Sequence, residues 1–137
     1  MYIVQISCEF APIAKVGGLG DVVSGLSHAL VEQGHEVEVI LPKYDTLDLE
    51  PLSKLELVLD DLESYYDQGW ITNNIWSAYY EDVKLLLIDP ENLTNYFKRG
   101  SIYGTCDDVE RFTYYSRAAL EMLVKTKPQP DIIHLHD

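Results

Sequence analysis

The fold is decided by residues 2–41, which read YIVQISCEFAPIAKVGGLGDVVSGLSHALVEQGHEVEVIL. The β-branched run at 2–7 predicts a strand buried on both faces, as strands of parallel sheets are. A loop rich in Pro, Gly and Lys follows at 9–20, and residues 21–33 then predict a helix. A second apolar strand is expected at 37–41. This order is that of a βαβ unit, whose two strands are expected to be parallel.

The predicted helix carries apolar residues on one side. Val22, Leu26, Ala29 and Leu30 are spaced i, i+4, i+7 and i+8, which places them on a single face. We expect this face to pack against the sheet. Gly34 follows the helix, where a residue with a left-handed backbone is expected.

The rest of the chain supplies further strands and one more helix. Residues 107–125 predict this helix, with an apolar face formed by Val109, Phe112, Ser116, Ala119, Leu120 and Leu123. The other expected elements are a short strand at 55–59, a hairpin of strands 75–80 and 83–88, a loop at 91–106 with one helical turn at 93–97, and a final strand at 131–136. We therefore predict an α/β fold, a Rossmann-like parallel sheet with helices on both faces and an inserted β-hairpin.

Composition and charge exclude several classes of protein. The chain has 137 residues, the size of one domain, and 47% of them are hydrophobic, which is enough for a core. A formal net charge of −13 argues against non-specific nucleic-acid binding and against docking on an anionic membrane. The cysteines, Cys8 and Cys106, lack a Cys-x-x-Cys spacing, which is typical of a reducing compartment. Without a signal peptide or spanning segment, a cytoplasmic protein is expected.

The loop before the first helix has the composition of an anion site. Gly17 and Gly18 are expected to allow positive φ angles and to let a ligand approach the backbone without meeting a Cβ atom. The start of the helix offers free N–H groups and partial positive charge, and Lys15 adds a full charge. Together these features predict a pocket suited to a diphosphate. A purely structural glycine turn is the alternative.

Two common phosphate-binding motifs do not fit this loop. Residues 18–20 supply the Gly-x-Gly of the dinucleotide fingerprint, but Val23 stands in the place of its third glycine. A P-loop is excluded because no Gly-Lys-Ser/Thr follows four spacer residues. An NAD-binding domain is further disfavoured because the nearest acidic residue after the second strand is Asp45, several positions beyond it.

Five segments carry a resemblance to a known family. They are SCEFAP at 7–12, KVGGLGDVV at 15–23, IYG at 102–104, DDVERF at 107–112 and DIIHLHD at 131–137. In this order they resemble segments of the ADP-glucose-dependent glycogen and starch synthases, and they extend over the whole chain. Asp108 stands where the family commonly has Asn. The last segment resembles the family's His-x-His-Asp-Trp strand end, without the Trp.

The resemblance implies the incomplete N-terminal half of a GT-B glycosyltransferase, in which two Rossmann-like domains face each other across a cleft. Such enzymes transfer glucose from ADP-glucose to the non-reducing end of an α-1,4-glucan, with retention at the anomeric carbon. They need no cofactor and no metal for this chemistry. Residues 1–137 would form the N-terminal domain, truncated, without the C-terminal nucleotide-binding domain. We therefore expect this chain alone not to turn over substrate.

The resemblance also implies roles in binding the donor. Lys15 would contact its phosphates, and Gly17 and Gly18 would let the diphosphate sit close. Asp21 would lie near the cleft. The alternative roles are a solvated loop lysine for Lys15 and a helix-dipole partner for Asp21.

The expected catalytic residues are His136 and Asp107. By the resemblance, His136 would hydrogen-bond the transferred glucose; it lies at the carboxyl end of a strand, where ligands of open α/β sheets bind. Asp107 and Tyr103 would line the cleft; their alternative roles are a helix N-cap and a packed aromatic. His134 lies on the same strand face as His136, and such a pair can bind zinc. No third ligand clearly completes that pair, so no metal site is predicted.

Two further residues are expected to support the site. Glu9 is placed to hold the loop or the acceptor, and Arg111 is expected to anchor its loop through an ion pair. A competing function is a non-catalytic module of the same fold that binds glucan or a sugar phosphate. Glycogen and starch both stay open as the product, as do ADP-glucose and UDP-glucose as the donor.

Overall fold

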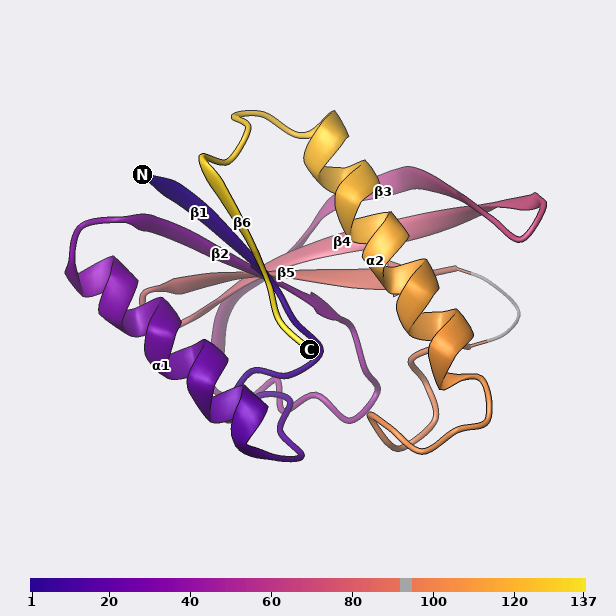
Figure 1. Ribbon diagram of the computed structural model, residues 1–137, viewed down its shortest axis with the longest axis horizontal. Helices are drawn as coiled ribbons and strands as arrows, with labels where there is room; N and C mark the ends of the chain where they lie inside the picture. Colours follow the sequence, from indigo (N-terminus) through magenta and orange to yellow (C-terminus); the bar gives the residue numbers. More distant parts are fainter. Residues whose placement is uncertain (92–94) are drawn as a thin grey trace.

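The described residues, 1–91 and 95–137 of this computed structural model, form a six-stranded sheet with two long helices (Figure 1). The elements in chain order are β1 (Tyr2–Ile6), α1 (Gly18–Glu32), β2 (Glu36–Pro42), β3 (Leu52–Tyr66), β4 (Gly69–Tyr80), β5 (Val83–Pro90), α2 (Asp108–Lys125) and β6 (Ile132–Leu135). The strands lie in the order β3-β4-β5-β2-β1-β6. Within this part of the chain, no helix is both long and apolar enough to cross a membrane.

Four neighbouring strands, β5, β2, β1 and β6, are parallel, which confirms the predicted βαβ unit. In the register, Val4 of β1 lies between Glu38 of β2 and Ile133 of β6. Nearly every position of β1 and β2 is buried. Burial on both faces explains why these strands are continuous apolar runs rather than alternating ones.

The two helices pack on opposite faces of the sheet. Side chains alternate along a strand, so each strand contributes to two cores. Ile40 of β2 packs in the cluster that contains Tyr115 of α2, whereas its neighbour Val39 packs in the cluster that contains Val23 of α1. The prediction of helices on both faces is therefore confirmed.

The start and the buried face of α1 differ from the prediction. The helix begins at Gly18, three residues before the expected Asp21. Val22 of the predicted apolar face is 59% exposed. The buried residues of α1 are instead Gly20, Val23 and Ser27. Periodicity of apolar residues missed this face because two of its members are a glycine and a serine.

The buried face of α2 is also rotated from the predicted one. Val109 is 82% exposed, and Leu120 is half exposed. The buried residues are Arg111, Tyr114, Tyr115, Ala118, Ala119, Met122 and Leu123. Tyr115 can be buried because its hydroxyl reaches the carbonyl oxygens of Ser7 at 2.8 Å and Ile40 at 2.7 Å. The buried face of α2 therefore includes residues whose polar groups find hydrogen-bond partners at the ends of the strands.

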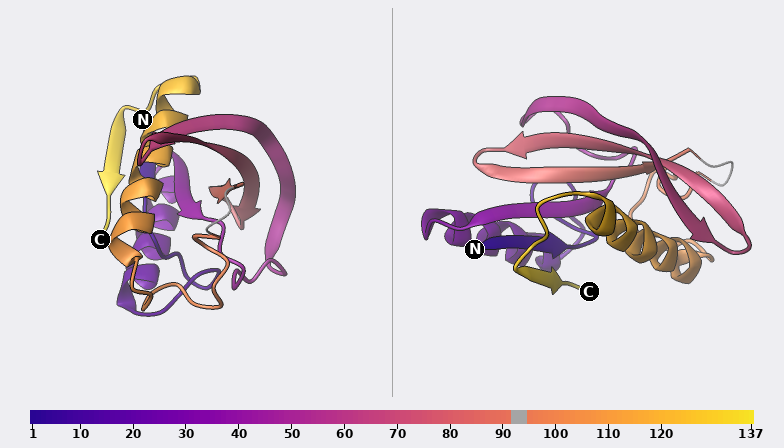
Figure 2. Two further views of the ribbon diagram at one scale, coloured as in Figure 1. Left: turned by 90° about the vertical axis from the view of Figure 1, so that its right-hand side faces the viewer. Right: turned by 90° about the horizontal axis from the view of Figure 1, so that it is seen from above.

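The third strand is much longer than the expected one at 55–59. β3 covers 15 residues and forms a curved antiparallel hairpin with β4 (Figure 2). Asp67 and Gln68 make its two-residue turn, with φ angles of 46° and 65°, the left-handed values that such a tight hairpin requires. The predicted hairpin of 75–80 and 83–88 is confirmed as β4 and β5. The helical turn expected at 93–97 begins outside the described residues.

Candidate functional site

The candidate site lies at the carboxyl ends of β1 and β6. The chain passes from β1 through α1 to β2 on one side, whereas β6, which follows α2, pairs with β1 on the other side. In open α/β sheets, ligands bind outside the carboxyl ends of the strands at such a reversal of strand order. The loop that contains Lys15 therefore shares one edge of the sheet with His136, the residue after β6 (Figure 1).

Glu9 is the buried carboxylate at this edge, with only 4% of the residue exposed. Its Oε2 accepts hydrogen bonds from the backbone N–H groups of Val16 at 2.8 Å and Gly17 at 3.0 Å. Its Oε1 accepts one from the hydroxyl of Tyr103 at 3.1 Å. One carboxylate thus joins the glycine loop before α1 to the segment before α2.

These donors hold Glu9 in its ionised form. Burial alone would raise the pKa of the carboxyl group, but the N–H groups of Gly17 and Val16 and the Tyr103 hydroxyl outweigh burial, so the pKa of Glu9 lies below its usual value. Burial, with Cys8 and Glu9 nearby, raises the pKa of Tyr103, which therefore stays a neutral donor. The structure shows that Glu9 holds the loop; its contact with an acceptor stays a prediction.

The glycines of the loop have different surroundings. Gly17 is the N-cap of α1 with a φ of −137°, and Gly18 is already helical, so the positive φ angles expected at both are wrong. A Cβ atom at either position would meet nothing within 4 Å. At Gly20 it would lie 3.2 Å from the nitrogen of Ala11 and 3.5 Å from the oxygen of Ala14. Packing therefore requires Gly20, whereas Gly17 and Gly18 leave space for a ligand.

Lys15 and Asp21 lie together at the start of α1. Lys15 Nζ is 2.8 Å from Asp21 Oδ2, and the two side chains are 44% and 58% exposed. An exposed pair of this kind adds little to stability, so its effect is to hold the lysine charge near the helix start. Lys15 and Tyr103 also line a common cavity of about 400 Å³.

Asp107 is engaged by Arg99, whose guanidinium donates to both carboxylate oxygens at 2.5 and 2.8 Å. This partner is the main cause that lowers the pKa of Asp107. Asp107 occupies the N-cap position of α2 without a side-chain capping bond. Asp108 closes the preceding turn, because it accepts from the N–H groups of Gly104 at 2.9 Å and Thr105 at 3.1 Å.

Arg111 ties the segment before α2 to the helix. It is fully buried, and its guanidinium lies 2.9 Å from Asp108 Oδ1. It also donates to the carbonyl oxygens of Tyr96 at 2.9 Å and of Ile102. A buried charge is tolerated only when it is paired and hydrogen-bonded. The expectation that Arg111 anchors its loop through an ion pair is confirmed.

His136 is held by the strand next to it. Its backbone N–H donates to Ile6 O at 3.0 Å, and its ring stacks on that of His134 with centroids 4.2 Å apart. Its Nε2 lies 2.8 Å from Gln5 Oε1. His136 and Cys8 line a cavity of about 270 Å³. Burial raises the pKa of Cys8 to about 12, so this thiol stays protonated.

A group of three potential metal ligands lies away from this edge. In the described part of the chain, His28 of α1 meets Glu81 and Asp82 of the β4–β5 turn, with His28 Nε2 3.0 Å from Glu81 Oε2. That turn precedes β5, so it lies at the amino edge of the parallel strands. His28 Nε2 also lies 3.7 Å from Asp82 Oδ1, so the contact joins one histidine to two surface carboxylates.

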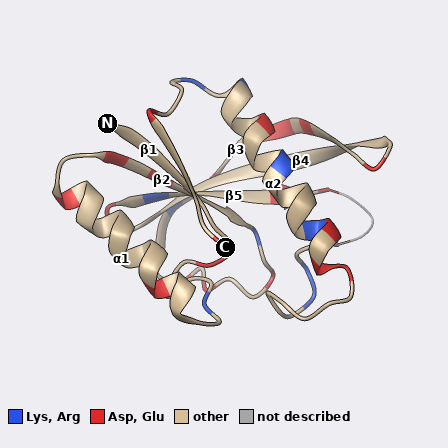
Figure 3. Cartoon of the chain, viewed as in Figure 1, with Lys and Arg blue, Asp and Glu red and all other residues tan. Residues whose placement is uncertain are grey.

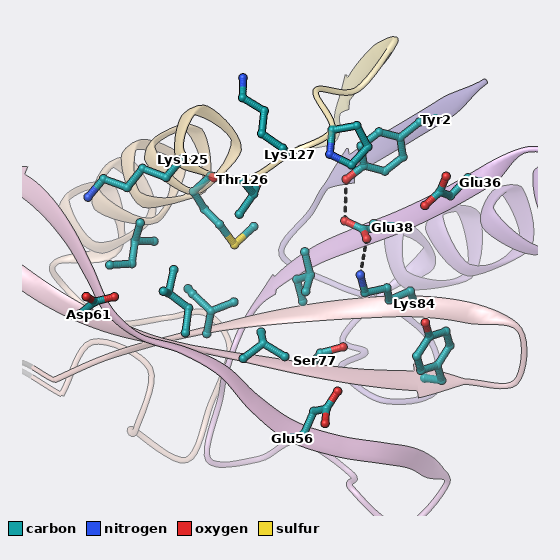
Figure 4. Close-up of a pocket in the computed structure, with 18 residues that line it drawn as sticks. Tyr2, Glu36, Glu38, Glu56, Asp61, Ser77, Lys84, Lys125, Thr126 and Lys127 are labelled. Carbon is teal, nitrogen blue, oxygen red and sulfur yellow. Dashed lines mark hydrogen bonds and ion pairs between the residues drawn. The ribbon is translucent and has the colours of Figure 1, made fainter.

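A further cavity in the described part of the chain also lies away from the predicted residues. Its volume is about 640 Å³, and it opens between the sheet and the C-terminal end of α2. Figure 4 shows Glu38 at its wall, held by Tyr2 at 2.7 Å and Lys84 at 2.5 Å. These residues lie at the amino ends of β1, β2 and β5. Strand topology, rather than cavity size, therefore assigns the candidate site to the carboxyl edge.

Sequence reasoning missed three residues that support the edge. Arg99 was passed over, although it holds Asp107 with two hydrogen bonds. Gln5 and Ser27 are fully buried and hydrogen-bonded to each other. The sequence does mark Gln5, because it is a polar residue inside an apolar strand.

These features define an α/β domain with open space and a lysine at the start of a helix, on the carboxyl edge of its parallel strands. The chain belongs to the family of the starch synthase catalytic domain, whose family model matches residues 2–137. It is 47% identical over its whole length to a glycogen synthase of Protochlamydia amoebophila, of which it covers 27%. It is also 47% identical to the probable starch synthase 4 of Arabidopsis thaliana, of which it covers 13%.

The structure is similar to the catalytic domain of starch synthase IV from Arabidopsis thaliana, solved with ADP and acarbose bound. The TM-score is 0.96 at 48% sequence identity, over 99% of this chain and 28% of that one. The predicted family and the Rossmann-like half of a GT-B fold are confirmed. The chain spans about a quarter or less of the length of these relatives.

We predict that Gly20→Ala destabilises the domain by about 1–3 kcal/mol, the usual effect of overpacking. Its Cβ would press on backbone atoms of the Phe10–Ala14 bridge, which two 2.8 Å hydrogen bonds hold in place. Gly25→Ala, in the same helix and with nothing within 4 Å of the added Cβ, is the matched control and should not destabilise the domain. Urea unfolding measures both. Equal effects of the two substitutions would contradict the assignment of a packing role to Gly20.

We predict that Glu9→Gln destabilises the domain by about 1–3 kcal/mol at neutral pH, because N–H groups lose a charged acceptor. The folded-state pKa of Glu9 lies below the unfolded one. Its contribution is therefore present above the unfolded value of about 4.3 and is lost as pH falls through the lower folded-state pKa. The stability difference between wild type and variant should shrink over that range. Glu32→Gln, at an exposed position of α1, is the control; a difference that does not depend on pH would refute the assignment.

Proposed function

We propose that this chain forms the N-terminal wall of the donor site in a retaining glucosyltransferase, which transfers glucose from ADP-glucose to the non-reducing end of an α-1,4-glucan. The observation that carries this proposal is the open space beside Gly17 and Gly18 at the start of α1, next to Lys15. The N–H groups of Val16 and Gly17 are taken up by Glu9. The dipole at the start of α1 and the Lys15 ammonium group are therefore the features that favour a diphosphate there. The similar starch synthase IV structure holds ADP and acarbose, which supports a nucleotide and a glucan-like sugar as ligands.

Lys15 is the proposed contact to the donor phosphates. The chain has 10 basic and 23 acidic residues, and acidic residues occur along both helices and on the β3–β4 hairpin (Figure 3). An anion at this edge is therefore attracted by local groups, not by the protein as a whole. Asp21 keeps the Lys15 ammonium at the helix start, and a diphosphate would compete with Asp21 for it.

The remaining roles follow from position. His136 is proposed to hydrogen-bond the transferred glucose, and Tyr103 to line the cleft beside the glycine loop, where Glu9 fixes its hydroxyl. Asp107 is proposed to act through Arg99, because both of its carboxylate oxygens are occupied by that guanidinium. No cofactor and no metal enter this proposal, since ADP-glucose itself is the activated donor.

The opposite wall of the donor site is proposed to come from a C-terminal nucleotide-binding domain. Charge develops on the leaving diphosphate during transfer, and preorganised donors must stabilise it there. Lys15 and the start of α1 face that charge from one side only. Residues 1–137 alone are therefore expected not to turn over substrate, and the parent protein is proposed to work in the cytoplasm.

The test is Lys15→Gln in the full-length protein that includes this chain. A charge-assisted hydrogen bond contributes about 1.5–3 kcal/mol, so kcat/KM for ADP-glucose should fall about 10- to 100-fold. Transfer of labelled glucose to a glycogen primer measures it. Lys125→Gln, at the C-terminal end of α2, is the control and should leave kcat/KM unchanged.

Two outcomes would contradict the proposal. Unchanged kcat/KM in the Lys15→Gln protein would remove Lys15 from the donor site. Incorporation of glucose by residues 1–137 alone would show that no second domain is needed. Binding of maltooligosaccharides by a full-length protein that transfers no glucose would favour a non-catalytic glucan-binding module instead.

A further inference from the structure

A relay of hydrogen bonds through Gln5 and Ser27 connects His136 to Val23 in the interior of α1. His136 Nε2 lies 2.8 Å from Gln5 Oε1, Gln5 Nε2 lies 2.7 Å from Ser27 Oγ, and Ser27 Oγ lies 2.7 Å from Val23 O. Gln5 and Ser27 are 0% exposed. Because water does not reach these two side chains, each of their polar atoms must form its hydrogen bond with the next group of the relay.

The direction of every hydrogen bond in the relay follows from the bond between Ser27 and the carbonyl oxygen of Val23. The carbonyl oxygen of Val23 can only accept, and at 2.7 Å two oxygen atoms repel unless a proton lies between them. The single hydroxyl proton of Ser27 therefore points to Val23. Ser27 Oγ must then accept from the group that faces it, which has to be the amide nitrogen of Gln5.

The same reasoning continues to the histidine. With its nitrogen on Ser27, the Gln5 amide presents its oxygen to His136, and an amide oxygen can only accept. His136 Nε2 must therefore carry a proton. The reverse amide orientation would place the Gln5 oxygen against the Ser27 oxygen without a proton between them.

We infer that Gln5 and Ser27 are positioning residues, which hold His136 in the tautomer with its proton on Nε2 and leave Nδ1 as a hydrogen-bond acceptor. The partner of such a nitrogen is a donor, and a neutral ring attracts no anion. His136 is therefore suited to a hydroxyl group of a neutral polyhydroxylated ligand. This last step rests on the proposed function, whereas the tautomer does not.

The surroundings of His136 favour the neutral ring. Burial lowers the pKa of His136, and the adjacent His134 lowers it further, against a smaller opposite effect of Asp137. The strand order brings the parts of the relay together, since β1 lies next to β6 and Gln5 of β1 is hydrogen-bonded to Ser27 of α1. The relay thus sets the chemistry of a site residue from within the core.

The test is ¹⁵N NMR of the histidine rings in the 137-residue chain at neutral pH. In the wild type, His136 Nε2 should show the shift of a protonated ring nitrogen and Nδ1 that of an unprotonated one. The Nε2-bound proton should be visible and slow to exchange with water. A wild-type ring protonated on Nδ1 would overturn the inference.

Variants of Gln5 and Ser27 distinguish a role in holding the His136 tautomer from a role in stability alone. Gln5→Leu removes the acceptor, so the slowly exchanging Nε2 proton should be lost, whereas Gln5→Glu retains an acceptor and should keep it. Ser27→Ala frees the Gln5 amide to rotate and should also remove the slow proton. The matched control is Ser24→Ala, one turn earlier on the same helix, which should leave the ring unchanged. Retention of the slow proton in both Gln5→Leu and Ser27→Ala would refute the relay.

The outcome is independent of the proposed function. A correct tautomer in a full-length protein that binds no glucan and no ADP-glucose would leave the relay standing and reject the proposed ligand. A wrong tautomer in a protein that transfers glucose would reject the relay alone. Ser27→Ala also keeps the test decisive if Gln5 variants do not fold.

Discussion

The Glu9 carboxylate accepts hydrogen bonds from Val16, Gly17 and Tyr103, and the arrangement of the whole ligand edge depends on it. Each donor comes from a segment that has no regular secondary structure of its own. Without a shared acceptor, the N–H groups of the loop would turn to water and the helix start would lose its fixed place. A buried, ionised carboxylate is stable here because its donors outweigh the effect of burial on its pKa.

Residues within β1 and just after it hold the other parts of the site in place. Inside the strand, Gln5 reaches into α1 and holds the ring of His136. Just beyond the strand, Glu9 holds the loop that leads into α1. Tyr115 of α2 reaches the carbonyl of Ser7 between them. Three residues of one short segment, Gln5, Ser7 and Glu9, therefore contact a loop, a histidine and two helices, so changes in this segment are expected to affect the whole edge.

The βαβ unit could be predicted because its signals are local. A strand buried on both faces is a continuous apolar run, and Gly34 adopts the left-handed backbone expected after the helix. The buried faces of the helices could not be predicted, because Ser27 and Arg111 are buried through hydrogen bonds to partners distant in sequence. β3 was underestimated because most of its side chains are exposed, which leaves no alternation to detect. Lys15, Asp21 and Tyr103 were placed near the site by motif, whereas their partners became known only from the fold.

Amide hydrogen exchange of Val16 and Gly17 tests the role of Glu9 most directly. Both residues are exposed at the surface of the loop, so their amides should exchange quickly unless the carboxylate holds them. Wild-type protein is predicted to protect both amides, and Glu9→Gln to reduce that protection about 10-fold or more, in line with the loss of charge-assisted hydrogen bonds. Fast exchange at both amides in the wild type, or equal exchange in the two proteins, would contradict the account.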